Sequence, residues 1–123
     1  MREILFRGKT LSTHEWVQGG YFSMNNRTFI VTEHDKDYRM YEVDPNSVGQ
    51  YIGQNDVAGD RIFEGDIVYV PSEDEYADIS WCEETSSFIL GFDCWIGDFD
   101  YFHGHELEVS GNTFDEGWFE TNG

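Results

Sequence analysis

The sequence predicts an all-β protein, and three observations support that fold class. Apolar and polar residues alternate with a period of two along several short segments, which is typical of half-buried strands. Those segments are rich in β-branched and aromatic residues, and aromatic residues make up 17% of the chain. No amphipathic helical pattern is longer than about two turns. The 123 residues suffice for one compact domain, or for two small barrels that share a core.

The stretch from Asp60 to Val70 is predicted to organise the rest of the chain. Gly65 can adopt φ > 0 without steric cost, and Asp66 can hydrogen-bond its own backbone just past that turn. The β-branched and aromatic run that follows is predicted as a buried strand ending at Pro71. Gly65 and Asp66 are therefore the predicted structural turn.

Further strands are predicted on both sides of this turn. Before it they cover residues 3–8, 15–22, 28–32, 38–43 and 48–53, and residues 15–32 form a hairpin. Asp44 and Pro45 have the residue types of a helix start, for one turn only. After it the predicted strands are 77–83, 87–92 and 106–110, with a turn at Gly111-Asn112.

The hairpin of residues 77–92 carries the most specific register prediction. If Glu84 pairs with Ser87, Trp81 faces Leu90 and Ile79 faces Phe92. The last two pairs would place four large apolar side chains on one face of the hairpin, which predicts a core there.

The charge of the chain is strongly negative, at −18 from 25 acidic and 7 basic residues. Residues 71–123 hold 14 acids and no Lys or Arg. Such a surface repels phosphate backbones, so direct nucleic-acid binding is not expected. The segment is either a solvated surface or a decoy for a basic protein. The candidate partner face consists of Glu73, Asp74, Glu75, Trp95, Asp98 and Asp100.

Cysteine and hydropathy patterns indicate the compartment. Cys82 and Cys94 do not make a disulfide framework, so two reduced thiols are expected. There is no apolar run of about 18 residues and no signal-peptide pattern, so we expect a cytoplasmic protein without membrane contact.

Candidate catalytic chemistry is sparse. His103 and His105 would share a face of an extended segment, and with Asp98, Asp100 or Glu106 they could hold a metal. Solvated histidines in an acidic loop are the simpler interpretation. No Gly-rich phosphate loop is present. We therefore expect no enzyme activity, no catalytic residues, no cofactor and no bound metal.

Five segments resemble the YopX family in their order along the chain. They are residues 1–8, 15–19, 48–53, 62–68 and 108–113. The resemblance implies a small phage or prophage protein with an SH3-like barrel built on the Gly65 stretch, and it brings no assigned biochemical activity. Residues 71–105 depart from the family pattern because they are acidic and aromatic.

The expected organisation follows from the resemblance and the strand pattern together. Residues 1–54 form an N-terminal β region, residues 55–113 the SH3-like barrel, and residues 114–123 a tail packed on it. The expected role is a non-enzymatic phage accessory protein in the host cytoplasm, binding an unidentified protein or forming a homo-oligomer. The alternatives are an acidic nucleic-acid mimic that blocks a basic host protein, and a metal-dependent enzyme using His103 and His105.

The acidic segment 71–123, called the acidic half below, generates the first testable prediction. Repulsion among its carboxylates is screened beyond a Debye length of about 8–10 Å at ordinary salt. The thermal unfolding midpoint should therefore rise with salt, most steeply up to about 0.15 M. Thermal melts followed by circular dichroism across a salt series measure this. A midpoint independent of salt would mean that arginines or bound cations already neutralise the acids.

Overall fold

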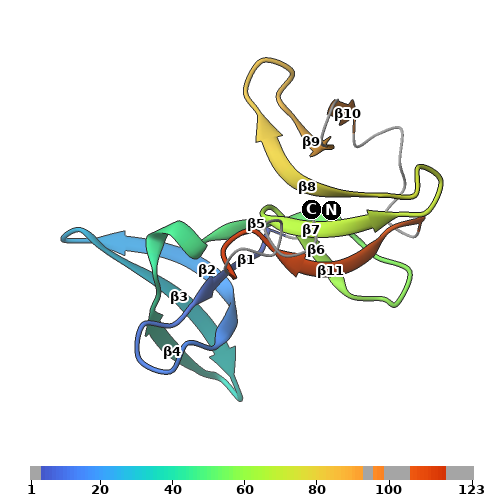
Figure 1. Cartoon of the computed structure of the whole chain (residues 1–123). Helices are drawn as coiled ribbons and strands as arrows, with labels where there is room; N and C mark the ends of the chain where they lie inside the picture. Colours follow the sequence, from blue (N-terminus) through green and yellow to red (C-terminus); the bar gives the residue numbers. More distant parts are fainter. Residues whose placement is uncertain (1–3, 93–95, 99–105, 116–123) are drawn as a thin grey trace. The chain divides into compact units, whose positions relative to one another are not determined.

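The computed structural model describes residues 4–92, 96–98 and 106–115 of the chain. The chain divides into two compact units, Met1–Tyr51 and Ile52–Gly123, each of which is described by itself. Nearly all of the regular structure is antiparallel β, and the short 3-10 helix η1 (Pro45–Ser47) is a single turn (Figure 1). The all-β fold class is confirmed.

The first unit is an antiparallel sheet in the order β4-β3-β2-β1-β5. Its strands are β1 (Phe6–Lys9), β2 (Trp16–Met24), β3 (Arg27–His34), β4 (Asp37–Glu42) and β5 (Gly49–Asn55), the last of which continues into the second unit. The predicted hairpin is confirmed as β2 and β3. Its two-residue turn places Asn25 and Asn26 at φ +52° and +63°, as a tight hairpin requires.

One face of this sheet is closed by close packing. Ile30 and Val43 are fully buried there. A Cβ at Gly8 would lie 2.8 Å from Val43 Cγ2 and 3.1 Å from Ile30 Cγ1, so only glycine lets β1 approach them.

The N-terminal cap of η1 is Asp44, whose side chain accepts a 2.9 Å hydrogen bond from the Asn46 amide.

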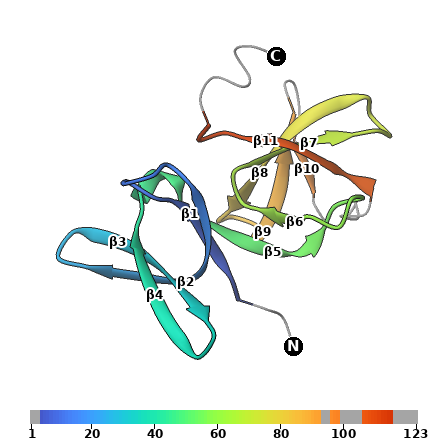
Figure 2. The same ribbon diagram turned by 90° about the horizontal axis from the view of Figure 1, so that it is seen from below.

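The second unit contains a five-stranded antiparallel sheet in the order β10-β9-β8-β7-β11 (Figure 2). Its strands are β7 (Asp66–Val70), β8 (Glu75–Cys82), β9 (Ser87–Gly91), β10 (Ile96–Asp98) and β11 (Glu108–Asn112), and β6 (Arg61–Phe63) pairs with β5. One buried apolar cluster fills it, made of Ile52, Ile62, Val68, Val70, Ala77, Ile79, Leu90, Phe92 and Leu107.

The strand pairing supports the β structure predicted over residues 55–113 but shows no closed barrel among the described residues. A loop meets β11 where a closed barrel would have a strand. The Val57 amide donates to the Leu107 carbonyl at 2.9 Å, and the Val109 amide donates to Asp56 Oδ2 at 2.9 Å.

The side chain of Asp56 holds the loop between β5 and β6, residues 56–60, by hydrogen bonds. Its Oδ1 accepts hydrogen bonds from the amides of Ala58 and Asp60 at 3.0 and 2.8 Å, while Oδ2 accepts the bond from Val109. The carboxylate is only 5% exposed. One buried side chain thus shapes the loop and ties it to a strand about fifty residues later in the chain.

The turn at Gly65 has the predicted left-handed backbone, with φ +92°. The Gly65 amide donates to the Ile79 carbonyl at 2.8 Å, and its carbonyl accepts from the Thr113 amide at 2.7 Å. Asp66 differs from the prediction, because its carboxylate accepts from the Phe63 amide before the turn, at 2.8 Å. The side chain therefore joins the end of the turn to the residue before it, and Asp66 is almost fully buried.

The predicted register of the β8–β9 hairpin is wrong by two residues. Cys82 pairs with Ser87, so Trp81 faces Phe88 and Ile79 faces Leu90. The turn has four residues, with Ser86 at φ +50°, and the hydroxyls of Thr85 and Ser87 lie 2.8 Å apart. A shift of two residues keeps each side chain on its face, so the predicted core remains.

The end of the chain also differs from the prediction. Gly111 and Asn112 belong to β11, whose pairing with β7 is irregular between Val109 and Gly111. The turn follows, where the Asp115 amide donates to Asn112 Oδ1 at 2.7 Å. Most of the tail predicted at 114–123 lies outside the described residues.

The Gly65 turn generates the second prediction. The variant Gly65→Val should lose on the order of 1–3 kcal/mol of unfolding free energy, because a β-branched residue is strained at φ +92°. Denaturant unfolding measures the loss. The matched control is Gly20→Val in β2, where an added Cβ meets nothing within 4 Å, and it should lose no stability. Equal losses in both variants would contradict the role given to the turn.

The Asp56 carboxylate generates the third prediction. Replacing it in Asp56→Ala leaves three amides without their acceptor, which should cost about 2–4 kcal/mol of unfolding free energy. Asp60→Ala removes the same charge from an exposed side chain in the same loop, and should change stability by less than about 0.5 kcal/mol. Chemical denaturation of both variants distinguishes loss of the hydrogen bonds from loss of charge.

Candidate functional site

The open face of the β2-β3-β4 sheet carries four exposed large apolar side chains, Phe22, Met24, Tyr38 and Met40. Cα partners across an antiparallel ladder share a face, and Phe22, Phe29 and Glu42 are aligned in this way. Met24 pairs with Arg27 and Val31 with Met40 on the same side. We call this surface the aromatic face; it consists of Phe22, Met24, Arg27, Phe29, Val31, Glu33, Tyr38, Met40 and Glu42.

Large apolar side chains on this face are unusually open to solvent. Tyr38 is 72% exposed, Met40 55%, Met24 49% and Phe22 41%. Phe29 at the centre is buried, and its ring lies 6.0 Å from that of Phe22. Contiguous exposed apolar patches, unlike scattered apolar residues, are typical of interaction surfaces in proteins.

Two of the three charged groups of the aromatic face, Arg27 and Glu42, are paired with each other. The Arg27 guanidinium lies 5.1 Å from the centre of the Phe29 ring and donates to Glu42 at 2.8 and 3.2 Å. This hydrogen bond raises the pKa of Arg27 and lowers the pKa of Glu42. The pair is exposed, so it orients side chains more than it stabilises the fold.

Basic side chains also lie over an aromatic ring between β1 and β2. The Arg7 guanidinium is 4.7 Å and the Lys9 ammonium 5.6 Å from the centre of the Trp16 ring. The aromatic face and this cation–aromatic group offer apolar area, ring faces and paired charges. Among their described residues, neither presents a histidine, cysteine or serine.

The acidic residues predicted as a partner face are only partly described. Glu73, Asp74 and Glu75 are exposed around the β7–β8 turn. The Tyr69 hydroxyl donates to Asp74 Oδ1 at 2.6 Å, which raises the pKa of Tyr69. The backbone of Asp98 belongs to β10. Trp95 and Asp100, like His103 and His105, lie outside the described residues.

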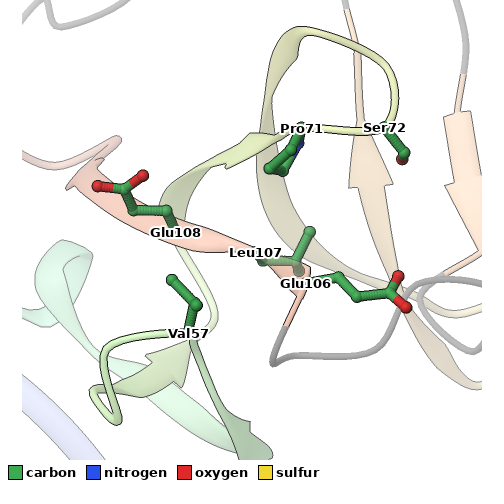
Figure 3. A pocket seen from close by; sticks show the side chains of 6 residues that line it. All are labelled: Val57, Pro71, Ser72, Glu106, Leu107 and Glu108. Carbon is green, nitrogen blue, oxygen red and sulfur yellow. The ribbon is translucent and has the colours of Figure 1, made fainter.

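A pocket of about 470 Å³ opens beside β11 (Figure 3). Its floor is the buried Leu107, flanked by the exposed Val57 and Pro71. Glu106 and Glu108 extend in opposite directions on either side of Leu107 (Figure 3). Ser72 completes the lining. The pocket suits a small apolar group next to carboxylates.

Metal-binding geometry is not found in the described part of the chain. Among those residues, no three His, Cys, Asp or Glu side chains lie close enough to hold an ion. Cys82 is a free, half-buried thiol, and its hydrogen bond with Thr85 lowers its pKa. The metal hypothesis for His103 and His105 concerns residues outside this part.

Reasoning from the sequence missed the aromatic face. The signal was present, because Phe22 and Met24 alternate with Tyr21 and Ser23, and Met40 with Tyr41. The alternation alone does not say which of two apolar faces is covered. The charge imbalance of residues 71–123, by contrast, is visible in the sequence without any structure.

Asp78 generates the fourth prediction, on pH. This carboxyl lies in the central strand β8 opposite Gly91, where a Cβ would approach Asp78 Oδ1 to 2.6 Å, and burial raises its pKa. An acid whose pKa is raised by folding loses stability as pH rises from the unfolded to the folded pKa. Asp78→Asn should therefore stabilise the protein at neutral pH.

The advantage of Asp78→Asn should shrink as pH falls towards about 4, the usual range for aspartate, because the carboxyl is then neutral in both states. Thermal melts of the variant and the original chain at several pH values measure this difference. Asp60→Asn, which removes an exposed carboxylate, is the control for a general effect of net charge. A constant difference at all pH values would contradict the role of burial.

Comparison with known proteins places the chain in a family. No curated protein matches it at the threshold applied. Within the described residues, no helix is long and apolar enough to cross a membrane. The family described as "YopX protein" matches residues 5–117, which is nearly the whole chain. The order of segments that resembles YopX therefore reflects true membership, and the chain belongs to the YopX family.

Proposed function

We propose that this chain is a non-enzymatic phage or prophage accessory protein that acts by binding another protein through the aromatic face. The exposure of four large apolar side chains on one sheet face is the observation that carries the proposal. Aromatic residues, methionine and arginine are the residue types enriched at the centres of protein interfaces. Phe22, Met24, Arg27 and Met40 supply all three types on this face.

The charge of the aromatic face favours a protein partner over a nucleic acid. Single-strand binders combine stacking aromatics with a positively charged groove. Here Arg27 is neutralised by Glu42, and Glu33 adds a further negative charge. The proposed partner surface is therefore apolar, with a polar rim.

The proposal includes a finer description of the second unit. We infer that residues 55–113 are an SH3-like barrel opened along β11, where the Asp56 loop replaces a strand. The buried cluster around Ile62, Val68 and Leu90 supports a core of that type. A role in the cytoplasm of the bacterial host belongs to the same proposal, as expected from the family.

The experiment is affinity capture from host lysate with the full chain as bait, repeated at high salt. Phe22→Lys places a charge on the aromatic face, and should abolish capture of a salt-resistant partner because an unpaired lysine would be desolvated at the interface. The matched control is Tyr21→Lys. Tyr21 is the next residue, is 49% exposed, and contacts one other ring, that of Phe6, on the opposite face.

The two lysine variants can be compared directly, because each loses an aromatic contact and gains the same charge. Loss of the partner in Phe22→Lys with retention in Tyr21→Lys supports the proposal. Equal capture by both variants, or loss in both, contradicts a specific role for the aromatic face. Circular dichroism of each variant shows whether the sheet is intact.

A second candidate function is mimicry of nucleic acid by the acidic half. The observation that favours it is the exposure of Glu73, Asp74 and Glu75 on consecutive positions around one turn. Capture of basic proteins that weakens at high salt, and that the triple replacement Glu73→Gln, Asp74→Asn, Glu75→Gln reduces, would support this function. Phe22→Lys should leave such capture unchanged.

A further inference from the structure

The pocket beside β11 is formed by three segments that backbone hydrogen bonds hold in place. Val57 comes from the loop between β5 and β6, and Pro71 and Ser72 come from the turn between β7 and β8. Leu107 directly precedes β11. The Val57 amide donates to the Leu107 carbonyl at 2.9 Å, and the Asp74 amide donates to the Pro71 carbonyl at 3.3 Å. The walls are thus fixed before a ligand enters, which limits the entropy lost on binding.

The interior of this pocket is apolar. The buried Leu107 forms the floor, and the walls carry Pro71, which is exposed, and Val57, which is 65% exposed (Figure 3). The volume of about 470 Å³ lies within the range of about 300–1,000 Å³ that is common for ligand pockets. Because a ligand would remove Val57 and Pro71 from water, the pocket favours an aliphatic group.

Two carboxylates flank the floor of the pocket. Glu106 and Glu108 are exposed and extend to opposite sides of Leu107 (Figure 3). A further carboxylate lies near the Glu108 side. The hydrogen bond with Asp74 is the main cause that raises the pKa of Tyr69, and the charge of Glu108 adds to it. An apolar centre between carboxylates is complementary to an aliphatic group between two cations.

The charge of the second unit selects the sign of the ligand. Residues 52–123 hold eighteen acids and one base, Arg61, whereas residues 1–51 are nearly neutral with seven acids and six bases. No lysine or arginine follows Arg61 in the sequence. A cationic ligand is therefore attracted to the pocket by the surrounding charge, whereas an anionic ligand is repelled.

The backbone beside the pocket limits how a peptide can bind. One edge of β11 pairs with β7, and the other is bonded to the Asp56 loop through the Val109 amide and Asp56 Oδ2, 2.9 Å apart. The Leu107 carbonyl already accepts from Val57. A peptide therefore cannot add to the sheet here as a further strand, and its side chains have to provide the recognition.

We propose that this pocket binds a basic segment of a protein partner. An aliphatic side chain of that segment enters the pocket, and a lysine or arginine on each side of it meets Glu106 and Glu108. Side chains two residues apart lie on one side of an extended chain, so the recognised pattern is cation, any residue, aliphatic, any residue, cation. The inference goes beyond the proposed function, because the pocket and the aromatic face belong to different units.

An NMR titration of the isotopically labelled full chain with the capped peptide Lys-Gly-Leu-Gly-Lys tests the inference. The amide signals of Val57, Ser72 and Glu108 should shift and saturate, whereas that of Phe29 on the aromatic face should stay in place. Two matched peptides separate the contributions. Lys-Gly-Gly-Gly-Lys lacks the aliphatic group and Gln-Gly-Leu-Gly-Gln lacks the charges, and each should bind about fivefold more weakly or worse.

Two double variants test the carboxylates. Glu106→Gln combined with Glu108→Gln should raise the dissociation constant of Lys-Gly-Leu-Gly-Lys about fivefold or more, because both charge contacts are lost. The matched control combines Glu83→Gln with Glu84→Gln. It removes the same charge from exposed residues at the other end of β8, and should change the constant by less than about twofold. The spectra also show whether each variant is folded.

The outcomes decide between a specific pocket and general attraction to an acidic surface. Weaker binding of both matched peptides, with loss in the Glu106 and Glu108 variant alone, supports the pocket. Equal binding of the leucine-free peptide, or equal effects of the two double variants, would overturn it. Absence of shifts at Val57 and Ser72 up to about 10 mM peptide would overturn it as well.

The proposed function can fail without this inference, and the reverse also holds. Phe22→Lys changes only the aromatic face, so it should leave binding of Lys-Gly-Leu-Gly-Lys within about twofold of the original chain. Capture of a host protein that depends on Phe22 is in turn independent of the two pocket glutamates. Loss of peptide binding in Phe22→Lys, in a variant whose spectrum shows a folded second unit, would overturn the assignment of the peptide to the pocket.

Discussion

The buried carboxylate of Asp56 is the interaction on which the second unit depends. It accepts three amide hydrogen bonds, two from its own loop and one from Val109 in β11. Without it, the edge of β11 and the loop after β5 would both expose unpaired backbone groups next to the core residue Leu107. A single aspartate therefore satisfies backbone amides of both the loop and the edge of β11. The Gly65 turn, bonded to Ile79 on one side and Thr113 on the other, fixes the opposite end of the same sheet.

The first unit is governed by a different constraint, which is its size. A sheet of about fifty residues cannot supply enough chain to cover both of its faces. One face is closed by Ile30, Val43 and the close approach of β1 at Gly8. The other keeps Phe29 buried only by surrounding it with Phe22 and the Arg27 side chain. The apolar area left on that face has no cover among the described residues, and this is the physical basis of the proposal that a partner binds there.

Charge and apolar surface are segregated along the chain. The acidic residues are concentrated after residue 51, whereas the aromatic face belongs to the part before it. Strong net charge keeps a protein soluble and disfavours indiscriminate association. An interface placed in the nearly neutral part can then be selective, because association elsewhere on the surface brings like charges together. The acidic half can serve solubility even where it binds nothing.

The sequence by itself determined the all-β class, most strand positions, the Asn25-Asn26 hairpin and the left-handed Gly65 turn, because these depend on local alternation and on residues with special backbone freedom. It also determined family membership, through the order of short segments. Only the tertiary structure decided the register of β8 against β9, the role of Asp56 and the absence of a closed barrel among the described strands. The candidate site was likewise hidden, since Phe22 and Tyr21 look alike in sequence. Tyr21 is 49% and Phe22 41% exposed, and only contacts between residues far apart in the chain show that Phe22 lies beside Phe29 on the open face. Alternation along one strand carries no information about what covers it.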